Sequence, residues 1–148
     1  MADKSTRPRL FIDADVLIAG SASPNEHSAS LVLLRMAEIT LIEAVTSEQV
    51  IRECERNLKE KIPRALPAFQ LLVQKSLKIV PDPTDEEQKI HHGKADVKDL
   101  PILVAASREG CAFLATFNLR HYQPGLSDVQ VLKPGELVLR IRHRLASL

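Results

Sequence analysis

The chain has 148 residues, of which 45% are hydrophobic, and its 20 Lys and Arg residues nearly balance 19 Asp and Glu residues to give a net charge of +1. This length and composition fit one domain, residues 1–148, with a sizeable core, and the small net charge argues against a strongly basic, non-specific DNA-binding protein. Aromatic residues are only 3% of the chain and Trp is absent, so an extended stacking platform for single-stranded nucleic acid is not expected.

The cysteines and the N-terminal segment bear on the cellular compartment. Cys54 and Cys111 are too far apart in the sequence for a paired metal site, and they do not form a disulfide framework. The first ten residues, MADKSTRPRL, lack the apolar run of a signal peptide, and no later stretch approaches the roughly 18 apolar residues of a membrane span. We therefore expect a soluble cytoplasmic protein with no membrane attachment.

Short apolar runs alternate with helical patterns through the first half of the chain. The predicted elements are a strand at 10–12, a polar loop at 20–30, a helix at 29–38, a strand at 41–45 and a helix from 46 to 61. Thr46, with Gln49 three residues later, is typical of a capping box, so Thr46 is predicted to cap the last of these helices. An apolar stripe that includes Val50, Cys54 and Leu58 gives this helix a buried face.

The second half continues the same alternation. The predicted elements are a helix at 65–75, a strand at 77–80, a helix at 86–91, a helix at 100–109, strands at 113–116 and 129–132, and a helix at 134–144. Asp99 is placed to cap the helix at 100–109, and Pro101 is acceptable in its first turn. Strands separated by helices imply right-handed crossovers and a parallel sheet covered on both faces. We therefore predict an α/β fold, a three-layer α/β/α sandwich around a central parallel sheet of about five strands.

Polar residues stand where several predicted elements meet. Asp13 follows the first strand directly, Asp99 precedes a helix, and Asn118 lies two residues after the fourth strand. Ligands bind outside the carboxyl ends of parallel strands, so this topology can bring the three residues to one rim. Each also has a purely structural explanation, because Asp13 can accept backbone N–H groups, Asp99 can cap a helix and Asn118 suits a turn. Asp15 and Asp96 are equally available for such a cluster.

Four blocks of sequence occur in a recognisable order. They are FIDADVLIAG, TSEQVIRECERNL and KDLPILVAASREGCAFLATFN, the last of which holds two blocks. Together they resemble the PIN-domain ribonucleases, the family that includes the VapC-type toxins of bacteria and archaea. The resemblance spans Arg9 to Tyr122. It places Asp13 and Asp99 as the first and third catalytic acids of that family.

The second block supplies the remaining acid. Glu53 stands in its place by resemblance only, because Glu48 and Glu55 border the same apolar stripe and helical spacing does not distinguish them. Arg52 and Arg56 lie close to Glu53 on the same predicted helix, so they are candidate contacts for substrate phosphates.

The last block departs from the family pattern. Many members have a fourth Asp where this chain has Asn118. The first block also departs from the pattern, because Asp15 occupies a position where a small polar residue is usual. Arg120 and His121, which follow Asn118, are further candidate substrate contacts. Asp96 is a substitute ligand for the missing acid.

The resemblance implies a metal-dependent reaction. Mg²⁺ and Mn²⁺ prefer oxygen ligands, so Asp13, Glu53 and Asp99 would hold one of these ions and the ion would offset their mutual repulsion. The expected activity is hydrolysis of RNA phosphodiester bonds, with Asn118 holding a metal-bound water or a phosphate oxygen. By analogy with the toxins, we also expect an RNA substrate, a small antitoxin partner and a homodimer.

Three alternatives compete with this interpretation. A haloacid-dehalogenase-type phosphatase would use Asp13 as nucleophile and Asp15 as general acid, with Asp96 and Asp99 as an acidic pair. A receiver domain would explain the acids after the first strand, but it lacks the phospho-accepting Asp after a central strand. A PIN-like domain could also bind RNA or a protein partner without cleaving it, and the departure at Asn118 keeps this alternative open.

Overall fold

Five parallel strands form a single sheet in a computed structural model that describes residues 7–22, 25 and 28–147. The strands are β1 (Arg9–Ile12), β2 (Glu43–Ser47), β3 (Leu77–Val80), β4 (Phe113–Ala115) and β5 (Gln130–Leu132). Their order across the sheet is β3-β2-β1-β4-β5, and every neighbouring pair is parallel. The predicted central parallel sheet is therefore confirmed.

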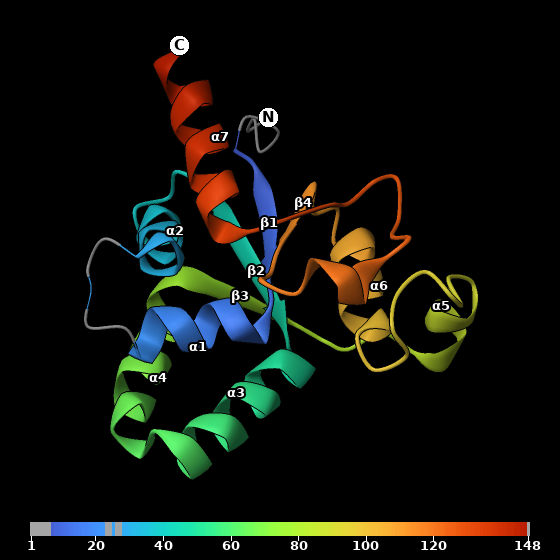
Figure 1. Cartoon of the computed structure of the whole chain (residues 1–148), viewed down its shortest axis with the longest axis horizontal. Helices are drawn as coiled ribbons and strands as arrows, with labels where there is room; N and C mark the ends of the chain where they lie inside the picture. Colours follow the sequence, from blue (N-terminus) through green and yellow to red (C-terminus); the bar gives the residue numbers. More distant parts are fainter. Residues whose placement is uncertain (1–6, 23–24, 26–27, 148) are drawn as a thin grey trace.

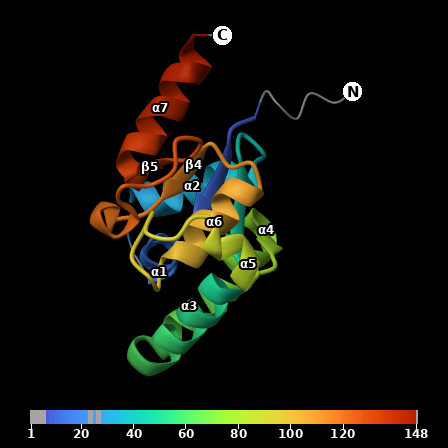
Figure 2. The same cartoon turned by 90° about the vertical axis from the view of Figure 1, so that its right-hand side faces the viewer.

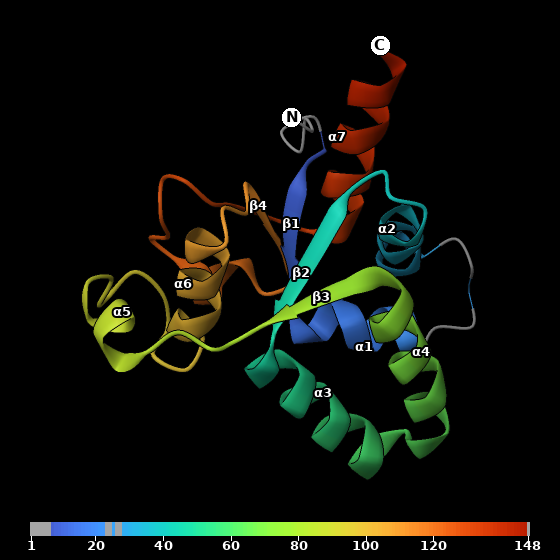
Figure 3. The ribbon, with the colours of Figure 1, turned by 180° about the vertical axis from the view of Figure 1, so that it is seen from behind.

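Helices cover both faces of this sheet. They are α1 (Ala14–Ala22), α2 (Ala29–Glu38), α3 (Glu48–Lys61), α4 (Leu66–Ser76), α5 (Asp85–Lys89), α6 (Leu100–Arg108) and α7 (Pro134–Ala146), with short 3₁₀ helices η2 (Pro63–Ala65) and η3 (Leu119–Tyr122). Helices α1, α2 and α7 lie on one side of the strands and α5 and α6 on the other (Figures 1 and 3). The predicted three-layer α/β/α sandwich is confirmed.

Among the elements of the described residues, helix α1 is the one long element that the sequence pattern did not predict. Its residues Ala14, Val16, Leu17 and Gly20 are buried, so apolar side chains surround the helix and no amphipathic period marks it. Gly20, predicted to begin a loop, lies inside this helix against α2, where an added Cβ would come within 2.7 Å of the Leu34 side chain. Residues 23–24 and 26–27 of the predicted loop lie outside the described residues.

The start of α3 differs from its prediction by one residue. Strand β2 continues to Ser47, and the Ser47 side chain, rather than that of Thr46, accepts the capping hydrogen bond from the Val50 N–H at 3.4 Å. The Thr46 hydroxyl instead donates to the Ile12 carbonyl at 2.9 Å and is fully buried between two strands. The predicted capping box at Thr46 and Gln49 is therefore wrong, because the Thr46 hydroxyl makes a tertiary hydrogen bond to Ile12 instead.

The central strand leads directly to the candidate site. Leu10, Phe11 and Ile12 of β1 have no exposed surface, and β1 pairs with β2 on one side and β4 on the other. The strand order reverses at the β1–β4 pair, which in open parallel sheets is where a crevice forms at the carboxyl edge. Helix α3 leaves the same edge at the end of β2 and projects beyond the sheet, at the end of the molecule opposite α7 (Figure 2).

No helix in the described part of the chain combines the length and apolar character needed to cross a membrane.

Candidate active site

Asp13 is held by hydrogen bonds at the point where β1 ends and α1 begins. Its backbone N–H donates to the Ala115 carbonyl at 3.0 Å, which extends the β1–β4 ladder by one residue. Its Oδ1 accepts from the Ala14 N–H at 2.7 Å, and its Oδ2 accepts from the Thr116 hydroxyl at 2.9 Å and the Tyr122 hydroxyl at 2.7 Å. Only 7% of Asp13 is exposed, so these donors and the positive end of α1 stabilise its buried charge.

Thr116 and Tyr122 belong to the site although the sequence analysis did not select them. Both hydroxyls are buried and both donate to Asp13, so they fix the position of its carboxylate. Burial, followed by the charge of Asp13, raises the pKa of Tyr122, and the phenol therefore stays a hydrogen-bond donor. Tyr122 is the only Tyr in the chain, and the need of a buried phenol for a polar partner is the signal that could have identified it.

Asp15 joins the start of α1 to the turn after β4. Its Oδ2 accepts from the Phe117 N–H at 3.0 Å and from the Asn118 side-chain amide at 3.0 Å, and it lies 3.3 Å from the Thr116 hydroxyl, whose single proton is donated to Asp13. Burial, followed by the charge of Asp13, raises the pKa of Asp15 to about 6. Because Asn118 donates through its amide nitrogen, its amide oxygen remains available as an acceptor.

Glu53 and Asp99 come from other elements to the same edge of the sheet. Glu53 is half-buried on α3, and burial, followed by the charge of Asp13, raises its pKa, to which Asp99 also contributes. Burial and then the charge of Asp13 likewise raise the pKa of Asp99. The structure therefore brings Asp13, Glu53 and Asp99 close enough to repel one another, from three separate parts of the chain.

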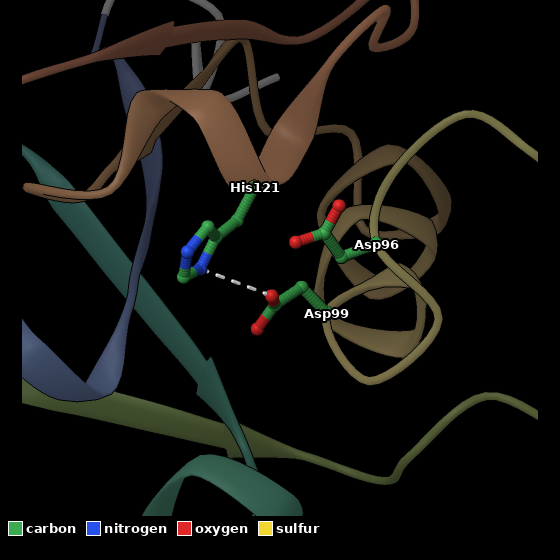
Figure 4. Close-up of side chains that lie close together, drawn as sticks. All are labelled: Asp96, Asp99 and His121. Carbon is green, nitrogen blue, oxygen red and sulfur yellow. Dashed lines mark ion pairs between the residues drawn. The ribbon is translucent and has the colours of Figure 1, made fainter.

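Asp99 also faces Asp96 and His121. It occupies the N-cap position of α6, but its side chain makes no capping hydrogen bond, so that part of the prediction was wrong. Instead its Oδ2 lies 3.3 Å from His121 Nδ1 (Figure 4). One ligand atom each from Asp96, Asp99 and His121 lie within 4.8 Å of one another. The structure thus places His121 beside the acids, although the sequence analysis made it a substrate contact.

The remaining predicted substrate contacts divide between two flanks. Arg52 and Arg56 line an open groove with Glu53 and Lys98 on the α3 side. Arg52 forms an ion pair with Asp82 at 2.8 Å and is therefore engaged by the protein itself.

Lys98 is a cation of this groove that the sequence analysis missed. Burial and the charge of Asp13 raise the pKa of Glu53, and the charge of Lys98 lowers it by a smaller amount. Lys98 therefore lies near the Glu53 carboxylate. Its position next to Asp99 in the chain is the signal that could have revealed it. Arg120 lies on the other flank and lines a second pocket with Phe117, Asn118 and His121.

Comparisons with known proteins place the chain in a family. A family model described as a PIN domain matches residues 9–120. A search of curated proteins finds no match.

Several solved structures share the fold at low sequence identity. VapBC2 from Rickettsia felis, bound to a DNA fragment from its promoter, is 12% identical with a TM-score of 0.64, covering 84% of this chain and 98% of that one. PAE2754 from Pyrobaculum aerophilum is 15% identical with a TM-score of 0.66, covering 92% and 96%. VapC20 from Mycobacterium tuberculosis, a sarcin–ricin-loop-cleaving toxin, is 15% identical with a TM-score of 0.51, covering 71% and 86%. The resemblance found in the sequence is confirmed: the chain belongs to the PIN-domain family and shares its fold with VapC-type toxins.

Proposed function

We propose that this protein is a divalent-metal-dependent endoribonuclease. The observation that carries the proposal is the convergence of Asp13, Glu53 and Asp99 at the carboxyl edge of the sheet, where burial and the charge of Asp13 raise the pKa of the other two carboxyls. Carboxylates held together at such an expense in repulsion and desolvation are typical of sites that a cation completes.

The donor groups fit Mg²⁺ or Mn²⁺. Both ions prefer carboxylate oxygens, and Asp13, Glu53 and Asp99 would hold the ion, with Asp96 and His121 beside it. Within the described residues Asp99 Oδ2 is buried and accepts no hydrogen bond, and its charged neighbour is His121 Nδ1 at 3.3 Å, so this oxygen retains lone pairs for a cation. From the residues that the structure describes, Asp13 Oδ1 accepts a single hydrogen bond, that of the Ala14 N–H, and so retains a lone pair for a ligand bond.

The side chains of this chain then divide the work of hydrolysis. A bound divalent ion supplies a water of lowered pKa and stabilises charge on the phosphate. Glu53 makes no hydrogen bond with the described residues and has a raised pKa, so it can accept a proton from the attacking water. Arg56 and Lys98, which line the groove beside Glu53, contact backbone phosphates. The Asn118 amide oxygen accepts from a water or orients the substrate.

From the family we infer that the substrate is RNA. We also infer that the protein partner is a small antitoxin. The similar structures include a VapBC2 assembly and a loop-cleaving VapC toxin, so we infer that this chain is the toxin of a toxin–antitoxin pair, acts in the cytoplasm and forms a homodimer. The family match favours this activity over the haloacid-dehalogenase-type phosphatase and the receiver domain.

Cleavage of a labelled structured RNA by the purified protein tests this proposal. The wild type and Asp99→Asn are compared in Mn²⁺, Mg²⁺ or EDTA, with Glu55→Gln as the matched control. Glu55 lies two residues beyond Glu53 on α3, so its side chain leaves the helix roughly 200° away. We expect metal-dependent cleavage that Glu55→Gln retains and Asp99→Asn loses. Cleavage unaffected by EDTA would contradict the proposal, and RNA binding without cleavage would favour a non-cleaving PIN-like domain.

A further inference from the structure

A second pocket adjoins the acids on the β4 side of the site. It is lined by Phe117, Asn118, Arg120, His121 and Lys133, among others. Phe117 is 45% exposed, whereas every other Phe or Tyr in the chain is buried or half-buried. An apolar ring therefore stands open to solvent directly beside the candidate active site.

The exposed ring is attached to a firmly held backbone. The Phe117 N–H donates to Asp15 Oδ2 at 3.0 Å, and the Asn118 N–H donates to the Thr116 hydroxyl at 3.1 Å. The Asn118 carbonyl accepts from the His121 N–H at 3.1 Å, which closes the turn. Phe117 is thus presented from a fixed position, so little conformational entropy would be lost when a ligand binds to it.

The charges around this ring differ in sign from those of the acid cluster. The side chains of Arg120 and Lys133 form no ion pair or hydrogen bond with the part of the chain that the structure describes, and no carboxylate lines this pocket. His121 connects the two regions, because it lines the pocket and its Nδ1 lies 3.3 Å from Asp99 Oδ2. A suitable ligand therefore has a flat apolar surface and an anionic group, and it continues into the acid cluster.

We propose that this pocket binds one nucleotide of single-stranded RNA next to the phosphodiester that is cleaved. Its base stacks on Phe117, and its phosphate lies between Arg120 and Lys133. The identification of RNA rests on the proposed ribonuclease function. Bases of a duplex are already paired and stacked, so only an unpaired base can reach the ring. The pocket therefore selects an unpaired nucleotide beside the cleavage position.

The variant Phe117→Trp makes the stacking directly visible. The chain has no Trp, so Phe117→Trp gives a protein whose tryptophan fluorescence comes from this pocket alone. The variant is titrated in EDTA, which prevents metal-dependent cleavage, with an unpaired oligoribonucleotide and with the same strand annealed in a duplex. We expect saturable quenching by the unpaired strand only, and loss of this quenching in Phe117→Trp/Arg120→Ala/Lys133→Ala. The control is Leu139→Trp, on α7 at a site that is 66% exposed, where no quenching is expected.

Binding of a labelled oligonucleotide, followed by fluorescence anisotropy, supplies the second measurement. Phe117→Ala is expected to weaken binding about 5- to 150-fold, the range for loss of one base–aromatic stack, and Phe117→Tyr is expected to restore it. Equal quenching by the duplex, or an unchanged affinity in Phe117→Ala, would overturn the pocket assignment while leaving the ribonuclease proposal intact. Stacking without cleavage by the metal-loaded wild type would overturn the ribonuclease proposal and support the pocket. A wild type that binds no RNA would overturn both.

Discussion

The two edges of the sheet differ in how their charged side chains are paired. At the amino edge, Arg9 lies within ion-pair distance of Glu43 at 3.4 Å and of Glu109 at 3.6 Å, and Arg7 lies 3.9 Å from Glu43. Each acid there faces a guanidinium, so the edge is close to electrically balanced. These pairs are partly exposed and modest in energy.

The carboxyl edge gathers more acids than its nearby cations, Lys98 and His121, can balance. Asp13, Asp15, Glu53 and Asp99 meet there, and none of them forms an ion pair with Lys or Arg within the described residues. Hydrogen bonds from Thr116 and other donors compensate part of the charge, but the pKa values of the last three acids are still raised. The charges at the amino edge are thus paired by arginines of the chain itself, whereas the acids of the carboxyl edge keep a surplus of negative charge, as the proposed cation site requires.

Removing an acid from the carboxyl edge should have the largest effect. Asp99→Asn is expected to lower metal-dependent RNA cleavage by on the order of 100-fold or more, because it deletes a proposed ligand. The same variant should be at least as stable as the wild type in EDTA, because one repulsive charge has gone. Cleavage rates and thermal unfolding of the same preparations check both parts. A variant that is inactive only because it is unfolded would not support the assignment.

Binding of a divalent ion should stabilise the folded chain, because the ion offsets the negative charge of the carboxyl edge. At an Mn²⁺ concentration about 100 times its dissociation constant, binding to the folded state adds about 2.7 kcal/mol, which corresponds to a rise in Tm of roughly 5–10 °C for a chain of this size. Calorimetry with Mn²⁺ and with EDTA measures this rise. Asp13→Asn should abolish it, whereas Glu109→Gln at the amino edge should keep it. An equal rise in both variants would place the ion elsewhere.

Exchanging Asp15 and Asn118 should test whether the hydrogen bond between them positions the Asn118 side chain. Asp15 accepts from the Asn118 amide at 3.0 Å, so Asn118→Asp alone sets two carboxylates against each other. The double variant Asp15→Asn/Asn118→Asp restores both the hydrogen bond and the total charge. We expect a coupling of about 1–2 kcal/mol in unfolding free energy, and partial recovery of activity in the double variant. Additive losses would show that the contact does not position Asn118.

The sequence was sufficient for the parts of the site that follow from topology. A residue directly after a buried strand must lie at the carboxyl edge, which is why Asp13 could be placed, and alternating elements were enough to predict the parallel sheet. Glu53 required the family resemblance, because three acids on one helix look alike until the orientation of that helix is known.

Contacts between distant residues could not be read from the sequence. The hydroxyls of Thr116 and Tyr122 reach Asp13 across more than 100 positions of the chain, and no local pattern encodes such a pairing. The same is true of Thr46, whose local sequence suggested a cap but whose hydroxyl bonds a neighbouring strand. Helix α1 was missed because a helix buried nearly all round has no polar face to reveal its period.

The pH dependence of stability should expose the same unpaired acids. Asp15 has its pKa raised to about 6 from an ordinary value of 3.8, so the folded chain keeps this proton where the unfolded chain loses it. The unfolding free energy should therefore fall, by about 1–2 kcal/mol, as the pH rises between these values in EDTA. The raised pKa values of Glu53 and Asp99 act in the same direction. Urea unfolding across this range measures the slope, which Asp15→Asn should reduce.

A substitution at the amino edge should have the smallest effect on stability and no effect on activity. Glu109→Gln removes one of the two carboxylates around Arg9, whose other partner, Glu43, remains at 3.4 Å, and it also breaks the 3.1 Å ion pair between Glu109 and Arg108. Partly exposed pairs of this kind contribute about 0.2–1 kcal/mol each, so the Tm should fall by only a few degrees. Metal-dependent cleavage should stay at the wild-type rate, because none of these charges lies at the carboxyl edge. If Glu109→Gln impaired cleavage as strongly as Asp99→Asn, charge at either edge would matter equally, and the assignment of the acids to a separate site would fail.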